Sequence, residues 1–203
     1  MGPLSLTPDP SLLLSGDMRP ETQPLTSLVH PLAERAAVRE ILMGAQDNLT
    51  NVLAVVLGVA IGAGRADLVA LAGLAAATAE AVSMGGVLYT STRAEQGLDR
   101  DVGIGSRRPA RLTPAQSGLI TFAAALAGGL IPLTPFLLFD LTAAVVASLL
   151  VSLAALFALG SWTGRIGGHV WWRDGIRVLV VAGLAAMAAA AVGLLLQVDR
   201  PGS

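Results

Sequence analysis

The chain has 203 residues, of which 54% are hydrophobic and 13% charged, and its mean hydropathy is +0.69. Soluble domains carry about 25% charged residues, so we expect this chain to be surrounded partly by lipid. Three further features each exclude a class of function. The net charge is −1, the chain has no cysteine, and none of its 13 cationic residues is lysine. The excluded classes are broad nucleic-acid binding, thiolate chemistry, and chemistry that needs a lysine, such as P-loop or Schiff-base reactions.

The N-terminal part of the chain divides into two segments. Residues 1–30 contain five prolines, which interrupt regular structure, and we expect a disordered tail there. Residues 31–40 combine apolar and charged side chains with helical spacing. This pattern predicts a short amphipathic helix on the membrane surface that runs into the first apolar stretch.

Five apolar stretches follow, and each is long enough to cross about 30 Å of hydrocarbon at about 1.5 Å per residue. The predicted fold class is therefore an all-α polytopic membrane protein with five transmembrane helices. Pro132 and Pro135 are expected to end or bend the third stretch, and Asp140 is expected to cap the fourth helix. The stretches cover residues 41–63, 67–91, 117–139, 141–161 and 175–197.

Arginine placement predicts how the chain is oriented in the membrane. Eleven of the 13 arginines lie in the N-terminal segment, in the connection 92–116 and in the segment that enters the last stretch, and these share one side of a five-span map. The positive-inside rule then places the N-terminus and the 92–116 loop in the cytoplasm, with the C-terminus on the opposite side. The tryptophans gather at the predicted cytoplasmic ends of the last two spans, as interfacial anchors do: Trp162, Trp171 and Trp172.

Two acidic residues fall inside predicted spans, where an ionised side chain costs about 2.5–3.5 kcal/mol at the helix centre. They are Asp47 in the first span and Glu80 in the second. Counting from the span ends predicts that Asp47 is level with Met84 and that Glu80 is one turn deeper. Helical spacing places Asn51 on the face of Asp47, and Met84 on the face of Glu80.

These side chains form a donor set for a divalent transition metal. Carboxylate and amide oxygens bind hard divalent ions, and a thioether favours Fe²⁺ or Mn²⁺ over Mg²⁺ or Ca²⁺. Carboxylates that lose protons when they bind metal also couple metal to protons. We therefore expect a metal site at Asp47, Glu80, Met84 and Asn51, with the metal as transported cargo and no resident cofactor.

Simpler roles compete with each of these assignments. Asp47 could cap or hydrogen-bond the start of the first span, Glu80 could be a paired structural acid, and Met84 could be a packing residue. An intramembrane enzyme with Ser83 beside Glu80 is a further alternative, although no pair of nucleophile and base is evident. Transport remains the leading interpretation of these residues. We therefore expect that the protein is not an enzyme.

Four segments, in order, resemble the vacuolar iron transporter family. Residues 39–50 resemble its R-x-I-x-x-G-x-x-D-G-L-T, and residues 81–91 resemble its A-x-S-M-(x)4-Y-x-S. Residues 128–136 are similar to G-x-I-P-L-x-P-[YF], and residues 156–160 are similar to L-F-x-L-G. The resemblance extends over roughly residues 34–197 and fits the five-span map.

The resemblance implies a homodimer of five-span subunits with a translocation path between the two first spans. It also implies export of Fe²⁺ or Mn²⁺ from the cytoplasm in exchange for protons. Asp47 and Met84 match the family's intramembrane metal positions. Gly58 and Gly62, spaced as G-x-x-x-G, are expected to allow the paired first spans to approach closely.

The chain departs from the family pattern at three places. The Glu-rich cytoplasmic metal-binding helices between spans two and three are replaced by the short 92–116 loop. The glycine after the first-span aspartate is Asn48, and the acid that some members carry two turns before the methionine is Ala76. Glu80 lies one turn from Ala76 on nearly the same face, so we expect Glu80 to replace that acid.

The sequence thus predicts a transporter that moves Fe²⁺ or Mn²⁺ out of the cytoplasm, by exchange with protons. The expected partners are the lipid bilayer, divalent metal ions, protons and a second copy of the chain. The lost metal-binding helices motivate one alternative, a non-transporting membrane scaffold or partner subunit with the same fold. The expected location is the inner membrane of a bacterium.

Overall fold

The computed structural model describes residues 25–101 and 112–196. Most of the expected tail, residues 102–111 of the expected loop, and residues 197–203 lie outside this range. Five of the described helices are long and apolar enough to cross a membrane, and the described residues contain no strand. The predicted all-α, five-span fold is therefore confirmed.

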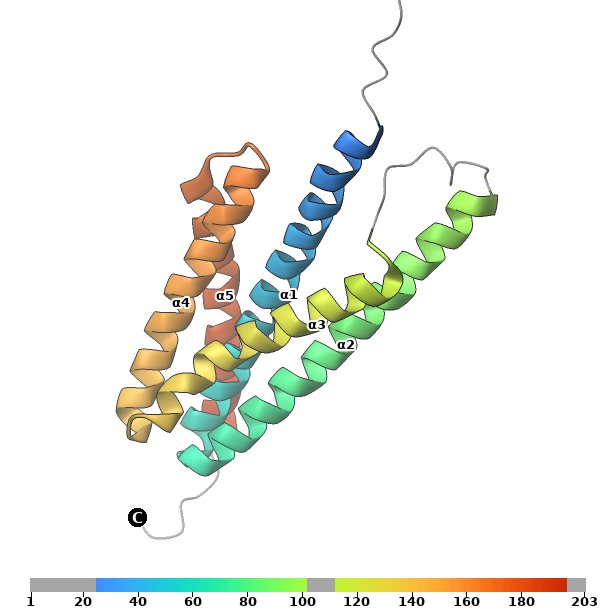
Figure 1. Cartoon of the computed structure of the whole chain (residues 1–203). Coiled ribbons are helices and arrows are strands. Elements are labelled where there is room, and N and C mark those ends of the chain that lie inside the picture. Colours follow the sequence, from blue (N-terminus) through green and yellow to red (C-terminus); the bar gives the residue numbers. More distant parts are fainter. Residues whose placement is uncertain (1–24, 102–111, 197–203) are drawn as a thin grey trace, which may run out of the picture.

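The helices form a bundle with α1 at its centre. α1 packs against α2, α3, α4 and α5, and α3 crosses obliquely between α1 and α2 (Figure 1). α4 and α5 form an antiparallel pair on the other side of α1. The elements are α1 (Leu25–Ala63), α2 (Ala66–Asp101), α3 (Pro114–Leu130), the 3₁₀ helix η2 (Ile131–Leu137), α4 (Leu141–Ile166) and α5 (Trp171–Leu195).

Two helices extend beyond the apolar stretches that predicted them. α1 begins at Leu25, inside the segment expected to be a tail, and continues through residues 31–40 into the membrane span without a break. α2 continues to Asp101, ten residues past the expected end of the second span. Both differences arise because hydropathy marks where a helix leaves the membrane, whereas the hydrogen bonds of the helix continue through polar residues.

The start of α3 is fixed by a capping box. The Thr113 hydroxyl accepts a hydrogen bond from the Gln116 backbone N–H at 3.2 Å, and the Gln116 side chain accepts one from the Thr113 N–H at 3.0 Å. Pro114 occupies the first turn, where its missing N–H leaves no bond unmade. Together these residues set where the third span begins.

The end of the third span follows from its two prolines. Pro132 and Pro135 lie in the 3₁₀ helix η2, so the prediction that they end the α-helix is confirmed. Asp140 then occupies the N-cap position of α4 with an extended backbone. The predicted N-cap position is therefore correct, but the exposed Asp140 side chain makes no capping hydrogen bond.

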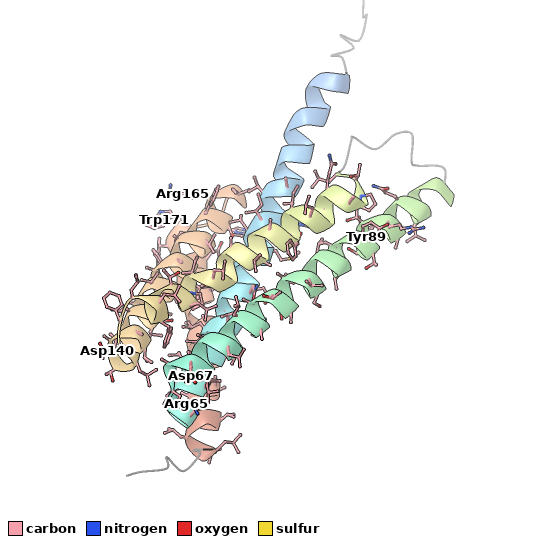
Figure 2. The ribbon with its side chains drawn as sticks, turned by 60° about the horizontal axis from the view of Figure 1, so that its bottom comes forward. Arg65, Asp67, Tyr89, Asp140, Arg165 and Trp171 are labelled. Carbon is pink, nitrogen blue, oxygen red and sulfur yellow. The ribbon has the colours of Figure 1, made fainter. Side chains whose placement is uncertain are left out.

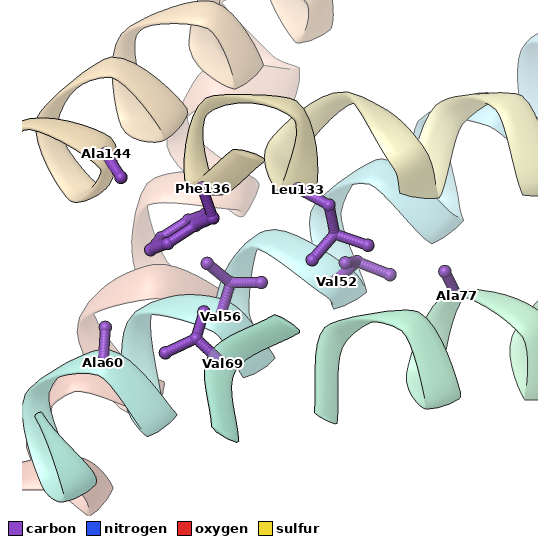
Figure 3. Packing of buried hydrophobic residues seen from close by; sticks show 8 residues of the cluster. All are labelled: Val52, Val56, Ala60, Val69, Ala77, Leu133, Phe136 and Ala144. Carbon is purple, nitrogen blue, oxygen red and sulfur yellow. The ribbon is translucent and has the colours of Figure 1, made fainter. Parts of the chain in front are cut away.

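The largest buried apolar cluster joins α1, α2, η2 and α4 (Figure 3). Lipid is as apolar as these side chains, so close van der Waals packing, rather than removal from water, stabilises the cluster. Most of the large apolar side chains of α5 face outward instead, as lipid-facing residues do, although Val178 and Leu179 pack against a second buried cluster. The buried members of the largest cluster are Val52, Val56, Ala60, Val69, Ala77, Leu133, Phe136 and Ala144.

The two glycines of α1 that we expected between subunits face α5 of the same chain. A Cβ atom on Gly58 would lie 3.1 Å from the Ala189 carbonyl oxygen, and one on Gly62 would lie 3.1 Å from the Gly193 carbonyl oxygen. The expectation that they serve the approach of two first spans is therefore wrong. The G-x-x-x-G spacing creates a flat helix face, but it does not determine which helix packs there.

Candidate functional site

Asp47 and Asn51 lie one turn apart on an exposed face of α1. Asp47 is in the middle of a continuous helix, so it does not cap a helix start. Neither side chain makes a hydrogen bond or ion pair with any residue in the described part of the chain. Both are therefore available to a ligand or to a second molecule.

Glu80 and Met84 lie one turn apart on α2, and both are half-buried. They flank the fully buried stripe that includes Ala77, Ala81 and Gly85, which faces the bundle. The Glu80 carboxylate has no hydrogen-bonding or ionic partner among the residues that the structure covers. The alternative of a paired structural acid therefore has no support within one chain.

A buried asparagine sets the register between α1 and α2. Asn48 donates one amide hydrogen bond to the Ala77 carbonyl oxygen at 3.0 Å and another to the Ala125 carbonyl oxygen at 2.8 Å. Along α2, Glu80 is about 4.5 Å and Met84 about 10.5 Å from Ala77 at 1.5 Å per residue. Asp47, adjacent to Asn48, is therefore closer in level to Glu80 than to Met84.

This register corrects the prediction that Asp47 and Met84 share a level. That prediction counted residues from the expected end of the second span, but α2 continues to Asp101 and the two helices cross at an angle (Figure 1). No hydrogen bond or ion pair joins Asp47 to Glu80 in the described structure. The four predicted ligands thus form two pairs, one on α1 and one on α2.

Asn48 is a site residue whose role the sequence did not reveal. It is fully buried at the point where α1, α2 and α3 meet, and it fits there because Gly129 has no side chain. A Cβ atom on Gly129 would lie only 2.8 Å from the Asn48 amide nitrogen. The sequence signal for this buried role was a polar residue in one apolar span together with a glycine in another span, against which it could pack.

Glu40 is a second buried polar residue, although it belongs to the segment 31–40 that was expected on the membrane surface. We expected a surface position, yet its side chain is 7% exposed. One carboxylate oxygen accepts a short hydrogen bond from the Ser117 hydroxyl, and that hydroxyl accepts one from Thr92 at 3.1 Å. The other carboxylate oxygen is buried without a partner in the described residues. Glu40 therefore links α1, α3 and α2 on the N-terminal side of Asp47.

The part of one chain that the structure describes does not bring together a complete set of metal ligands. Within residues 25–101 and 112–196, no group of three or more His, Cys, Asp or Glu side chains is close enough to hold a metal ion. The chain does provide carboxylate and amide oxygens on α1, and a carboxylate and a thioether on α2. These are donors that a divalent transition metal accepts, but in numbers too small for a complete site.

Opposite ends of the bundle carry different charged groups. Arg165 and Trp171 lie at one end, and Arg65 and Asp67 lie at the other (Figure 2). Arg65 forms an exposed ion pair with Asp67 at 2.5 Å, and this hydrogen bond raises the pKa of Arg65. The tryptophan end has the exposed aromatic side chains that typify a membrane–water boundary.

These features define an integral membrane protein whose membrane-spanning helices carry carboxylates with no partner among the described residues, an arrangement typical of transport proteins. The sequence matches the VIT family over residues 38–102 and 97–194, which together cover most of the chain. The chain therefore belongs to the VIT family, whose members are membrane metal-ion transporters rather than enzymes. No curated protein matches the chain significantly.

The two matched segments overlap at residues 97–102, at the C-terminal end of α2. The first covers the membrane spans of α1 and α2, and the second covers α3, α4 and α5. Only residues 102–113 separate α2 from α3, which is too short for a helical domain. The predicted absence of the cytoplasmic metal-binding helices agrees with this connection.

Proposed function

We propose that the chain exports Fe²⁺ or Mn²⁺ from the cytoplasm in exchange for protons. The observation that carries this proposal is the exposure of Asp47 and Asn51 on a membrane-spanning helix, where neither has a partner among the described residues. An acid at such a position is costly unless it faces water, a cation or a protein surface. A transported cation supplies the missing charge.

A second copy of the chain would complete the coordination sphere. If the exposed faces of two α1 helices meet in a homodimer, Asp47 and Asn51 are doubled around one axis, and Glu80 and Met84 border the same space. The Met84 thioether would favour a transition metal over Mg²⁺ or Ca²⁺. Protons released from Asp47 and Glu80 when the metal binds would couple the two fluxes.

Glu80 would supply the second carboxylate in place of the acid that is missing at position 76. Ala76 packs against the buried apolar cluster that includes Val52 and Val56, where a carboxylate would meet hydrocarbon. Glu80 lies one turn further along α2 and is half-buried, beyond that cluster. The chain thus keeps an acid on this flank of α2 at a position where its charge is easier to accommodate.

The arginine distribution supports an orientation with the N-terminus in the cytoplasm and the C-terminus outside. In this orientation the Trp171 end of the bundle faces the cytoplasm. The pair Arg65 and Asp67 then lies on the opposite side. We assign the protein to the inner membrane of a bacterium as the location consistent with this topology.

The test is metal uptake into liposomes that contain the purified protein and an internal pH-sensitive dye. The wild type should take up Mn²⁺ and Fe²⁺ with opposite movement of protons, and should take up Ca²⁺ poorly. D47N and E80Q should lose both fluxes, because neither amide can exchange a proton. D140N is the matched control, since Asp140 is an exposed acid at a helix turn, away from these four residues.

Two results would contradict the proposal. Unchanged metal flux in correctly inserted D47N and E80Q would remove these carboxylates from the path. A wild-type protein that moves neither metal nor protons would favour the alternative of a scaffold or partner subunit, for which the short connection between α2 and α3 is the motivating observation.

A further inference from the structure

A cavity of about 500 Å³ opens between the end of α4 and the start of α5. Its walls are apolar and aromatic on one side, where Phe157 and Ala158 contribute, and cationic on the other, where Arg165 contributes. Trp162 and Trp171 complete the rim and are both exposed. The cavity therefore changes from apolar to cationic at the level where tryptophans mark the membrane boundary.

The guanidinium of Arg165 is held in place but is not neutralised. It lies 5.4 Å from the centre of the Trp171 ring, in a cation–π contact. Trp171 is itself braced by an edge-on contact with Phe157, with ring centres 6.4 Å apart. Arg165 makes no ion pair with any residue in the described ranges, so its charge is available to an anion.

The nearby acid that would compete for this arginine is already engaged. The Asp174 carboxylate binds Arg177 at 2.7 Å and lies 3.3 Å from the His169 ring nitrogen. Gly164 allows α4 to approach Asp174 closely, which keeps this carboxylate between the two helices. The cavity wall thus has a net positive charge.

Two further donors point to an anionic occupant. Ser161 is one of the residues that line the cavity, and its hydroxyl, beside Gly175 of α5, is buried without a hydrogen-bond partner in the described residues. α5 begins at Trp171 without a side-chain cap, and the N-terminus of a helix attracts anions. A phosphate group is an anion that a guanidinium, a hydroxyl and a helix N-terminus bind together.

We propose that this cavity binds an anionic phospholipid, with the headgroup phosphate at Arg165 and the acyl chains along Phe157 and Ala158. A lipid is favoured over free phosphate because the cavity continues into an apolar wall at a membrane boundary. In the orientation proposed above from the arginine distribution, this end of the bundle lies in the cytoplasmic leaflet. The proposal concerns neither the metal nor the proton path, so it stands or falls independently of transport.

The test uses tryptophan quenching by brominated lipids in vesicles that contain the full-length protein. A W172F background leaves Trp162 and Trp171, which both line the cavity. Brominated phosphatidylglycerol should bind about fivefold more tightly than brominated phosphatidylcholine, the factor expected from one exposed ion pair. R165Q should abolish this preference, and R165K, which keeps the charge, should retain most of it.

Arg173 provides a matched control. In the wild type its guanidinium lies 5.4 Å from the Trp172 ring centre, and it does not line the cavity, so R173Q in the same W172F background should preserve the preference. Equal quenching by the two lipids in the parent protein would overturn the proposal, as would equal losses in R165Q and R173Q. A change in tryptophan emission when inorganic phosphate is added to phosphatidylcholine vesicles would assign the cavity to a free anion instead.

Discussion

Replacing Gly129 by alanine should destabilise the junction of α1, α2 and α3 through a collision with Asn48. The new Cβ atom would lie 2.8 Å from the Asn48 amide nitrogen and 3.0 Å from the Ala77 Cβ atom. Overpacking of this kind costs about 1–3 kcal/mol. N48A alone should cost about 1 kcal/mol, because it removes two interhelical hydrogen bonds of about 0.6 kcal/mol each.

The double variant N48A/G129A separates this collision from a general loss of packing. Without the Asn48 amide the closest contact disappears, so the two changes should cost less together than their sum, by about 1 kcal/mol. Unfolding by sodium dodecyl sulfate in mixed micelles, followed by circular dichroism, gives the free energies. G183A is the control, because a Cβ atom there meets nothing within 4 Å and should be additive with N48A.

Additivity of N48A and G129A within about 0.5 kcal/mol would refute the reasoning, because contacting residues are expected to couple more strongly than that. It would mean that the Asn48 amide does not contact the position that a Cβ atom on residue 129 of α3 would occupy. The same experiment also tests the register of α1 against α2, since the Ala77 hydrogen bond defines it.

Three further changes probe other contacts of the bundle. Gly193→Ala should cost at least about 2 kcal/mol in the same unfolding assay, because its Cβ would collide with the rigid Gly58 carbonyl oxygen, whereas Gly183→Ala should cost nothing. Ser117→Ala should cost about 1.5–3 kcal/mol, since it removes the hydroxyl that donates to the buried glutamate of α1; a loss below 0.5 kcal/mol would contradict that role. Thr113→Ala should cost about 1 kcal/mol, and hydrogen exchange should quicken in the first turn of α3 and nowhere else.

The span count and the end of the third span were predictable because their causes are local. Each span is set by the hydropathy of its own residues. Pro132 and Pro135 each lack a backbone N–H, so each disrupts α-helical hydrogen bonding at its own position in the span. The VIT family was recognisable for the same reason, since its motifs lie within single spans.

The burial of Glu40 was not predictable from its own neighbourhood. Glu40 follows Arg39 at the edge of an apolar stretch, which is the pattern of a surface residue. Its hydrogen-bond donor, Ser117, is 77 residues away in the chain. Sequence periodicity identifies a helix face, but it does not identify the residue that covers that face.

The same limit applied to the glycines of α1 and to the level of Asp47. Gly58 and Gly62 were correctly read as positions of close helix contact, but the partner is α5 of the same chain. Asp47 was correctly placed within the first span, but its level relative to α2 depends on the Asn48 bond to Ala77. Both outcomes depend on which helices become neighbours, and this is determined by the packing of the whole bundle.

The contacts of α1 limit how this protein can change shape. Near its C-terminal end the helix backbone touches α5 at Gly58 and Gly193, and further toward its N-terminus Asn48 fastens it to α2 and α3. Turning or sliding α1 alone would break attachments at both places. The motion that preserves them moves α1, α2, α3 and α5 together as one rigid unit, so any hinge lies outside the contacts at Gly58, Gly193 and Asn48.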